Sequence, residues 1–153
     1  MAMPFLTHIP FVEHLGLELL RLDPGEAELQ LVLRPELTNS WEVAHGGVVM
    51  TLLDVALAHG ARSPEAAGGE PQPGVVTVEM KTSFMRPAEG ELRALGKLLH
   101  KTSTMAFCEA TLLDGHGQLC AQASGTFKYL RGLPARDRVT RQTPTTQHAK
   151  DAS

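Results

Sequence analysis

The sequence lacks any run of about 18 apolar residues, the length that a membrane-spanning helix requires. It also lacks a basic leader followed by an apolar stretch at its N-terminus, so we expect a cytoplasmic protein with no membrane span. Basic residues do not cluster with aromatic ones, and the net charge of −3 attracts no polyanion. These absences argue against nucleic acid as a partner.

Cysteine is also scarce, and its two copies are poorly placed for a disulfide. Cys108 and Cys120 flank a turn at residues 114–117, and a hairpin centred there puts them opposite residues near 123 and 111, not opposite each other. We therefore predict two free thiols in a reducing compartment. No pair of His or Cys has the spacing of metal ligands, so we predict no metal site.

What the sequence does contain is a long apolar stretch at residues 44–62, AHGGVVMTLLDVALAHGAR, which we predict to be a helix. A helix that is apolar on nearly every face is a buried helix. The carboxylate in its middle, Asp54, is costly to bury unless it is paired, hydrogen-bonded or partly neutralised by a raised pKa. Asp54 therefore needs a functional or structural reason.

The start of this helix is a second unusual feature. His45-Gly46-Gly47 puts two residues without side chains in the first turn, where backbone amides have no intrahelical acceptor. Such amides can bind an anionic or carbonyl oxygen. Taken alone, each feature also has a plain structural interpretation: a glycine-rich helix start, and a carboxylate paired across a subunit interface.

The remainder of the chain has the alternation of strands. We predict a short helix at residues 9–16 and strands at residues 17–22, 26–33, 74–85, 91–101, 104–113 and 118–129. In the first strand after the long helix, Val76, Val78, Met80 and Phe84 alternate with polar residues, which places these four on one face. The following strands have hairpin spacing and form a meander. Residues 1–130 are predicted to be one domain, and residues 131–153 a disordered tail.

These elements predict an α+β fold in which an antiparallel sheet covers one long helix. The edges of such a sheet need cover, so we expect association through it. His45 and Asp54 are nine positions apart, roughly 13 Å along a helix, and cannot act on one substrate atom within one chain. If both act on the same group, one must come from a neighbouring subunit related by a two-fold axis.

The chain resembles the hotdog-fold acyl-CoA thioesterases, most closely their phenylacetate-pathway branch. The resemblance is carried by the stretch from Asn39 to His45-Gly46-Gly47, by Asp54 seven residues later, and by the segments Gly74–Met80 and Phe84–Pro87. It covers residues 9–129. It implies a hotdog fold, with an antiparallel sheet wrapped around one central helix, and a homodimer or dimer of dimers that hydrolyses acyl-CoA. It implies no cofactor beyond the coenzyme A of the substrate.

The resemblance also implies catalytic roles. The Gly46 amide would polarise the thioester carbonyl, with Asn39 assisting and His45 orienting the group. Asp54 of the partner subunit would act as general base or nucleophile, and Thr77 would position the water. These roles agree with the chemistry, because fixed amides stabilise the charge that develops on the carbonyl oxygen, and a raised pKa makes a carboxylate a better base.

For substrate binding, the resemblance implies residues that contact the coenzyme A portion. Gly47 lies beside the proposed oxygen-binding amide. Arg86, Lys101 and Lys128 are the candidates for the phosphates, although a cation at a strand end is equally well explained as a solvated surface residue.

Two other functions remain open at this point. Asp54 and His59 match the Asp-x4-His dyad of hotdog hydratases, but five helical positions are about 140° apart, so the two side chains should diverge. His59 is otherwise expected to be structural or a surface residue. A non-catalytic acyl-CoA sensor of the same fold is the second alternative. Such sensors usually lack the helix carboxylate, which this chain retains.

Overall fold

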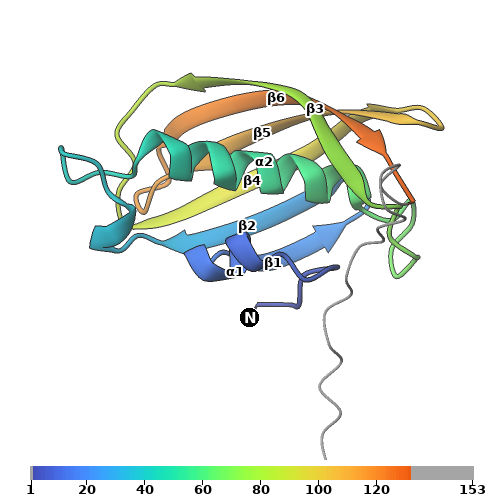
Figure 1. The fold of residues 1–153 in the computed structure, drawn as a ribbon, viewed down its shortest axis with the longest axis horizontal. Helices are drawn as coiled ribbons and strands as arrows, with labels where there is room; N and C mark the ends of the chain where they lie inside the picture. The colour runs from blue at the N-terminus through green and yellow to red at the C-terminus, as the bar shows by residue number, and fades with distance from the viewer. Residues whose placement is uncertain (1, 132–153) are drawn as a thin grey trace, which may run out of the picture.

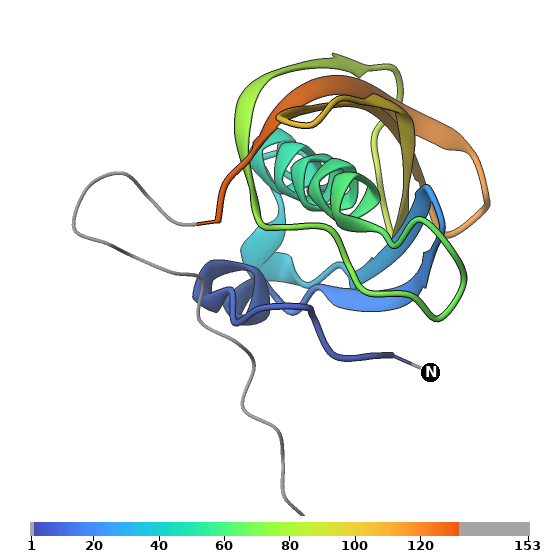
Figure 2. The same cartoon turned by 90° about the vertical axis from the view of Figure 1, so that its right-hand side faces the viewer.

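Helix α2 (Gly46–Arg62) lies along the concave face of a curved antiparallel sheet that wraps around it (Figures 1 and 2). The structure is a computed structural model, and it describes residues 2–131. The short helix α1 (Pro10–Leu15) and the 3-10 helix η1 (Pro35–Leu37) lie outside the sheet. The sheet is made of six strands: β1 (Glu18–Asp23), β2 (Glu26–Val32), β3 (Val75–Phe84), β4 (Glu91–Lys101), β5 (Met105–Leu113) and β6 (Leu119–Tyr129). The predicted α+β arrangement is confirmed, and each element ends within two residues of its predicted bounds.

The strand order differs from a continuous meander. β4, β5 and β6 are hairpin neighbours, as predicted, but the full order is β1-β2-β4-β5-β6-β3. β3 therefore pairs with β6 and not with β4, while β4 pairs with β2. The chain crosses to the far edge of the sheet after α2 and returns after β3. Hairpin spacing alone cannot reveal such a crossing, because a short connection between β3 and β4 is compatible with both arrangements.

The core lies between α2 and the concave face of the sheet. On the helix, Leu52, Leu53, Ala56 and Leu57 are completely buried. Gly96 on β4 allows this close packing, because a side-chain carbon at that position would overlap the carbonyl oxygen of Ala56. The sheet contributes the other large, fully buried side chains, which include Leu19, Leu29, Leu31, Leu92, Leu112 and Phe127.

A β-bulge interrupts β3 between Thr77 and Glu79, where Val78 is an extra residue opposite β6. Val78 is exposed, whereas Met80 packs against the core. The prediction that these two share one apolar face is therefore wrong, because an inserted residue shifts the alternation by one position. As a result of the bulge, Thr77 faces α2.

The two edges of the sheet differ. At the β1 edge, the backbone N–H of Met3 donates a hydrogen bond to the carbonyl of Leu19, 2.8 Å away, so the N-terminal segment partly covers the strand. At the other edge, no strand within residues 2–131 pairs with the outer side of β3. β3 is ten residues long and exposes Val76, Val78 and Phe84. A long, uncovered, apolar edge strand is a surface suited to pairing with another chain.

Three further predictions concern the rest of the chain. Among residues 2–131, no helix is long and apolar enough to cross a membrane. Cys108 and Cys120 are both free, as predicted, and Cys108 lies opposite Gly125, two residues from the predicted partner position. The predicted tail lies, from residue 132 onward, outside the described residues.

Candidate active site

Asp54 lies on the side of α2 that faces away from most of the sheet, and its carboxylate is half-buried. The hydroxyl of Thr77 on β3 donates a hydrogen bond of 2.7 Å to the carboxylate oxygen Oδ1. Burial raises the pKa of Asp54 above its ordinary value, and the hydrogen bond from Thr77 lowers it in part. The site thus contains a carboxylate with increased basicity and one fixed hydrogen-bond donor.

A cleft of about 490 Å³ opens beside Asp54, between α1, α2 and β3. Its walls are mostly apolar side chains, including Ile9, Phe11, Met50, Val75 and Met80. Apolar walls with few polar groups are typical of a site for an organic ligand.

The start of α2 is organised by His45. The His45 ring nitrogen Nδ1 accepts a hydrogen bond of 2.9 Å from the backbone N–H of Gly47, so His45 is the N-cap. Because Nδ1 is an acceptor, a neutral His45 carries its proton on Nε2 and can donate a hydrogen bond from there. The carbonyl of Gly47 accepts from the Thr51 hydroxyl. The Gly47 amide N–H is therefore already bonded to the His45 ring and is not available to a substrate.

The neighbouring amide has no such partner. Within the described residues, the N–H of Gly46 donates to no protein acceptor. It is the first amide of α2, where the helix dipole places partial positive charge. The ring of Phe84 lies beside it, 3.6 Å from the position that a side-chain carbon on Gly46 would occupy.

Asn39 shapes the loop that precedes the helix. Its side-chain oxygen accepts hydrogen bonds from the backbone N–H groups of Trp41 at 2.9 Å and Val43 at 3.4 Å. Between them, Glu42 has a φ of 60°, in the left-handed region that L-residues rarely adopt. Because the oxygen of Asn39 is used by the loop, only its side-chain N–H groups are left to contact a substrate.

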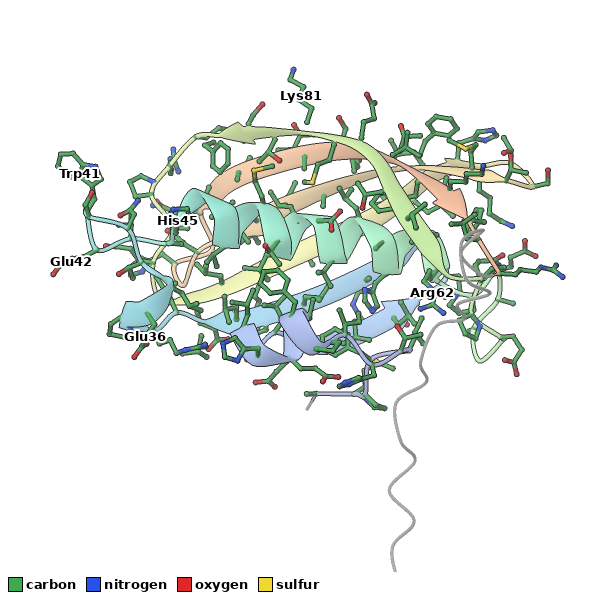
Figure 3. All side chains as sticks on the ribbon, viewed as in Figure 1. Glu36, Trp41, Glu42, His45, Arg62 and Lys81 are labelled. Carbon is green, nitrogen blue, oxygen red and sulfur yellow. The ribbon has the colours of Figure 1, made fainter. Side chains whose placement is uncertain are left out.

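A second cleft, of about 560 Å³, opens at this end of the helix. Asn39, Trp41, Gly46, Phe84 and Arg86 are among its lining residues. Figure 3 shows Trp41 and His45 together at the N-terminal end of α2, with Arg62 at the opposite end.

The structure separates the predicted site residues into two groups. Asp54 and Thr77 line one cleft, while Asn39, Gly46 and Arg86 line the other, and the two clefts share no lining residue. Gly46 and Asp54 are eight positions apart on one helix, about 12 Å along its axis. A single chain therefore contains two halves of a site that do not meet.

Lys101 lies apart from Arg86. Its ammonium group pairs with Glu65 at 2.6 Å, just beyond the C-terminal end of α2. Arg86 instead follows β3 near the N-terminal end of the helix. Two of the three cations predicted to bind the coenzyme A phosphates, Arg86 and Lys101, are thus not neighbours in one chain.

His59 is the residue of this region whose environment the sequence did not reveal. Its imidazole is only 3% exposed, and its Nδ1 lies 2.8 Å from the carbonyl oxygen of Val55. Burial lowers its pKa to about 4. Asp54 bonds to Thr77 and not to His59, so the structure does not assemble the hydratase dyad. The only feature of the sequence that could have indicated the bond to the Val55 carbonyl is the position of His59, one helical turn after Val55. That spacing does not tell whether the histidine is buried or exposed.

Comparisons with known proteins agree with this geometry. The sequence matches the Thioesterase superfamily over residues 42–121. The solved structure of the conserved protein PA5202 from Pseudomonas aeruginosa is 30% identical, covers 82% of this chain and 97% of its own, and has a TM-score of 0.73. A structure of the phenylacetic acid degradation protein PaaI from Thermus thermophilus is 27% identical, with 80% and 100% coverage and a TM-score of 0.69. The medium/long-chain acyl-CoA thioesterase YigI of Escherichia coli is 27% identical over 80% of this chain and 87% of that protein.

Proposed function

The chain belongs to the thioesterase superfamily, and from that membership we propose that it hydrolyses an acyl-CoA thioester to a free carboxylic acid and coenzyme A. The observation that carries the proposal is the division of the polar groups of α2 between two clefts. One cleft has a hydrogen-bond donor without an acceptor, the Gly46 amide, and the other has a carboxylate with a raised pKa, Asp54. An enzyme that hydrolyses a thioester uses both kinds of group at one carbonyl. The donor stabilises the charge that forms on the carbonyl oxygen, and the carboxylate activates the water that attacks the carbonyl carbon.

A homodimer would bring the two halves together through β3. If two copies of β3 pair antiparallel about a two-fold axis that passes between Lys81 and its copy, residues 79–83 pair in regular register. The extra residue Val78 then brings Thr77 of one chain opposite Phe84 of the other. Thr77 is bonded to Asp54, and Phe84 packs beside Gly46. This pairing therefore places the carboxylate of one chain near the free amide of its partner, and two such sites form per dimer.

The reaction in this site follows from the charges. The carbonyl oxygen of the thioester accepts hydrogen bonds from the Gly46 amide, from the His45 ring and from the side-chain N–H groups of Asn39, which stabilise the negative charge that forms on attack. As general base, Asp54 of the partner subunit takes a proton from water while the water oxygen bonds to the carbonyl carbon. The carbon–sulfur bond then breaks, and the departing thiolate recovers the proton.

In the alternative route, the Asp54 carboxylate attacks the carbonyl carbon, the carbon–sulfur bond breaks with release of the coenzyme A thiolate, and water hydrolyses the resulting mixed anhydride. Both routes need an ionised carboxylate close to the donors. The Thr77 hydroxyl serves both, because it donates to Oδ1 and leaves its own lone pairs able to accept a hydrogen bond from water.

Arg86 is the stronger candidate for a coenzyme A phosphate, because it is exposed and lines the cleft that contains the Gly46 amide. Lys101 already has an acidic partner in Glu65 and would have to exchange it. Gly47 would contribute by leaving room for the substrate, because it has no side chain. Its amide would not contribute, because it is bonded to His45. The two buried free cysteines fit the reducing environment of the cytoplasm, the compartment in which we propose that the protein acts.

The test is release of free thiol from acyl-CoA by Asp54→Asn. The change preserves shape and removes the base, so kcat should fall by about 10²- to 10⁴-fold. Because burial raises the pKa of Asp54, a neutral amide is easier to bury than the carboxylate, and the thermal midpoint should not fall.

Glu70→Gln provides the matched control, since it removes a carboxylate from an exposed loop. It should leave both thiol release and thermal stability unchanged. Near-normal turnover by Asp54→Asn would refute the proposed mechanism. A wild-type protein that binds acyl-CoA without releasing thiol would refute the enzymatic function and favour a sensor.

A further inference from the structure

A buried nitrogen in the Asp54 cleft has no hydrogen-bond partner. His59 is 3% exposed and lines the cleft together with Asp54. Its Nε2 is shielded from solvent and forms no hydrogen bond within the described part of the chain. Buried polar atoms almost always have partners, so an exception of this kind indicates a missing one.

The chemistry of the ring determines what that partner can be. The carbonyl of Val55 can only accept a hydrogen bond, so Nδ1 of His59 must carry the proton and donate. With a pKa of about 4, the ring is neutral near pH 7, and its second nitrogen has a free lone pair. Nε2 is therefore an acceptor only, and its partner must donate a hydrogen bond.

The surroundings of the His59 ring further restrict which kind of hydrogen-bond donor can bind Nε2. The cleft walls are apolar, and the charge of Arg62 is felt at the His59 ring, where it disfavours protonation. Both features oppose a cationic donor such as an ammonium group. A neutral hydroxyl meets the requirement at the lowest desolvation cost.

The position of His59 relative to Asp54 sets a distance. Five helical positions correspond to about 7.5 Å along the axis of α2, and the roughly 140° between the two side chains around the axis adds to this separation. An extended acyl chain spans about 7.5 Å with about six bonds between its carbonyl carbon and a terminal oxygen, so about six bonds is the lower limit. The ring of Phe5 packs edge-on against the imidazole, with 5.4 Å between ring centroids, and helps to hold the ring in place.

We propose that His59 is a specificity-determining residue that accepts a hydrogen bond from a hydroxyl on the acyl chain. The preferred substrates are then acyl-CoA thioesters with a hydroxyl at least about six bonds from the reacting carbonyl carbon. This inference rests on the proposed thioester hydrolysis, because it takes the cleft beside Asp54 as the acyl site.

Three matched substrates test the inference: hexanoyl-CoA, 6-hydroxyhexanoyl-CoA and 6-methoxyhexanoyl-CoA, together with the same set lengthened by two and by four carbons. The methoxy compound retains the oxygen but cannot donate a hydrogen bond. For the wild-type protein, kcat/KM should be about tenfold higher for the hydroxy compound than for either of the others.

His59→Phe removes the acceptor while keeping a planar ring. The ratio of kcat/KM for the hydroxy compound to that for hexanoyl-CoA should fall at least tenfold, because the hydroxyl is then buried without a partner. His100→Phe is the matched control. His100 is exposed and stacks on Phe107, and its replacement should leave the ratio unchanged.

The outcomes separate the two proposals. If no acyl-CoA releases thiol, the proposed function is wrong. If hexanoyl-CoA is hydrolysed and the wild-type protein shows no preference for the hydroxy compound, hydrolysis stands and the role of His59 is overturned. The wild-type comparison gives this answer even if His59→Phe does not fold. A ratio that survives in a folded His59→Phe protein would also overturn it.

Discussion

At the start of α2, the polar group available to a substrate is a backbone amide held by residues next to it in the chain. Eight residues further along, it is a carboxylate held by a strand that is distant in the sequence. His45 caps the helix and engages the Gly47 amide, whereas the Gly46 amide has no acceptor among residues 2–131. Asp54, in contrast, depends on Thr77, 23 positions away on β3.

Because of this difference, the amide end of the site at Gly46 and the carboxylate end at Asp54 can be disrupted separately by substitution. The amide end is shaped by short-range hydrogen bonds within residues 39–47, so a substitution there should act on the donor without disturbing the sheet. The carboxylate end depends on the packing of α2 against β3 and on the bulge that turns Thr77 inward. The following experiments use that separation.

The largest effect is expected from mixing two inactive proteins. Asp54→Asn lacks the base, and Gly46→Pro lacks the amide, so each homodimer should be inactive. In a mixed dimer, one site combines the intact Asp54 of one chain with the intact Gly46 of the other. Unfolding and refolding an equimolar mixture should restore about a quarter of wild-type thiol release, since half of the dimers are mixed and each has one complete site.

No recovery on mixing, in proteins shown by light scattering to have exchanged subunits, would mean that the site is not shared between chains. The same light-scattering measurement tests the dimer. A monomer that still releases thiol would contradict the proposed arrangement.

The next effect is that of Gly46→Pro alone. Proline is well tolerated in the first turn of a helix, and His45 has φ −58° and ψ 139°, a conformation that suits a residue before proline. The change removes one N–H group, and loss of one such donor should lower kcat by about 10²- to 10³-fold. Circular dichroism should show an unchanged fold.

Gly46→Ala is the control, because it retains the amide and its added carbon makes only ordinary contact with Phe84. Its kcat should remain within about threefold of the wild-type value. Equal losses in the two variants would show that space, and not the amide, is what the site requires.

A smaller and more specific effect concerns pH. The active form of Asp54 is ionised, so the rate should fall as pH decreases through its pKa, which burial has raised. The Thr77 hydrogen bond lowers that pKa, and Thr77→Val removes it. The acidic limb of the profile of kcat/KM against pH should therefore move to higher pH. A limb that stays in place would mean that Thr77 acts on the water or on packing alone.

The smallest effect is expected at Glu42. Its left-handed conformation costs an L-residue about 1–2 kcal/mol, whereas glycine adopts it freely. The greater entropy of glycine in the unfolded chain offsets part of this gain, so Glu42→Gly should stabilise the protein by a net amount of about 0.5–1 kcal/mol. Glu42→Ala keeps the strain and should change stability little. Denaturant unfolding of both variants measures the difference, and equal midpoints would contradict it.

Much of the amide end could be predicted from sequence, because its structure is local. The His-Gly-Gly start and the solitary Asp54 are visible without coordinates, whereas the part of Asn39 in shaping the loop was not predicted. The position of β3 at the free edge and its bulge could not be predicted, since both depend on which strands pair. The same reason explains why the burial of His59 and the separation of Lys101 from Arg86 became evident only in the fold.

The sequence by itself determined the chemical groups that this protein carries: a helix start with two glycines, a single carboxylate in the middle of α2, and the lengths of the helices and strands. These properties follow from the residue and its immediate neighbours. Only the tertiary structure decided which groups face one another. Strand order and register depend on contacts between residues far apart in the chain, and those contacts turned Thr77 towards Asp54 and left β3 open to a partner.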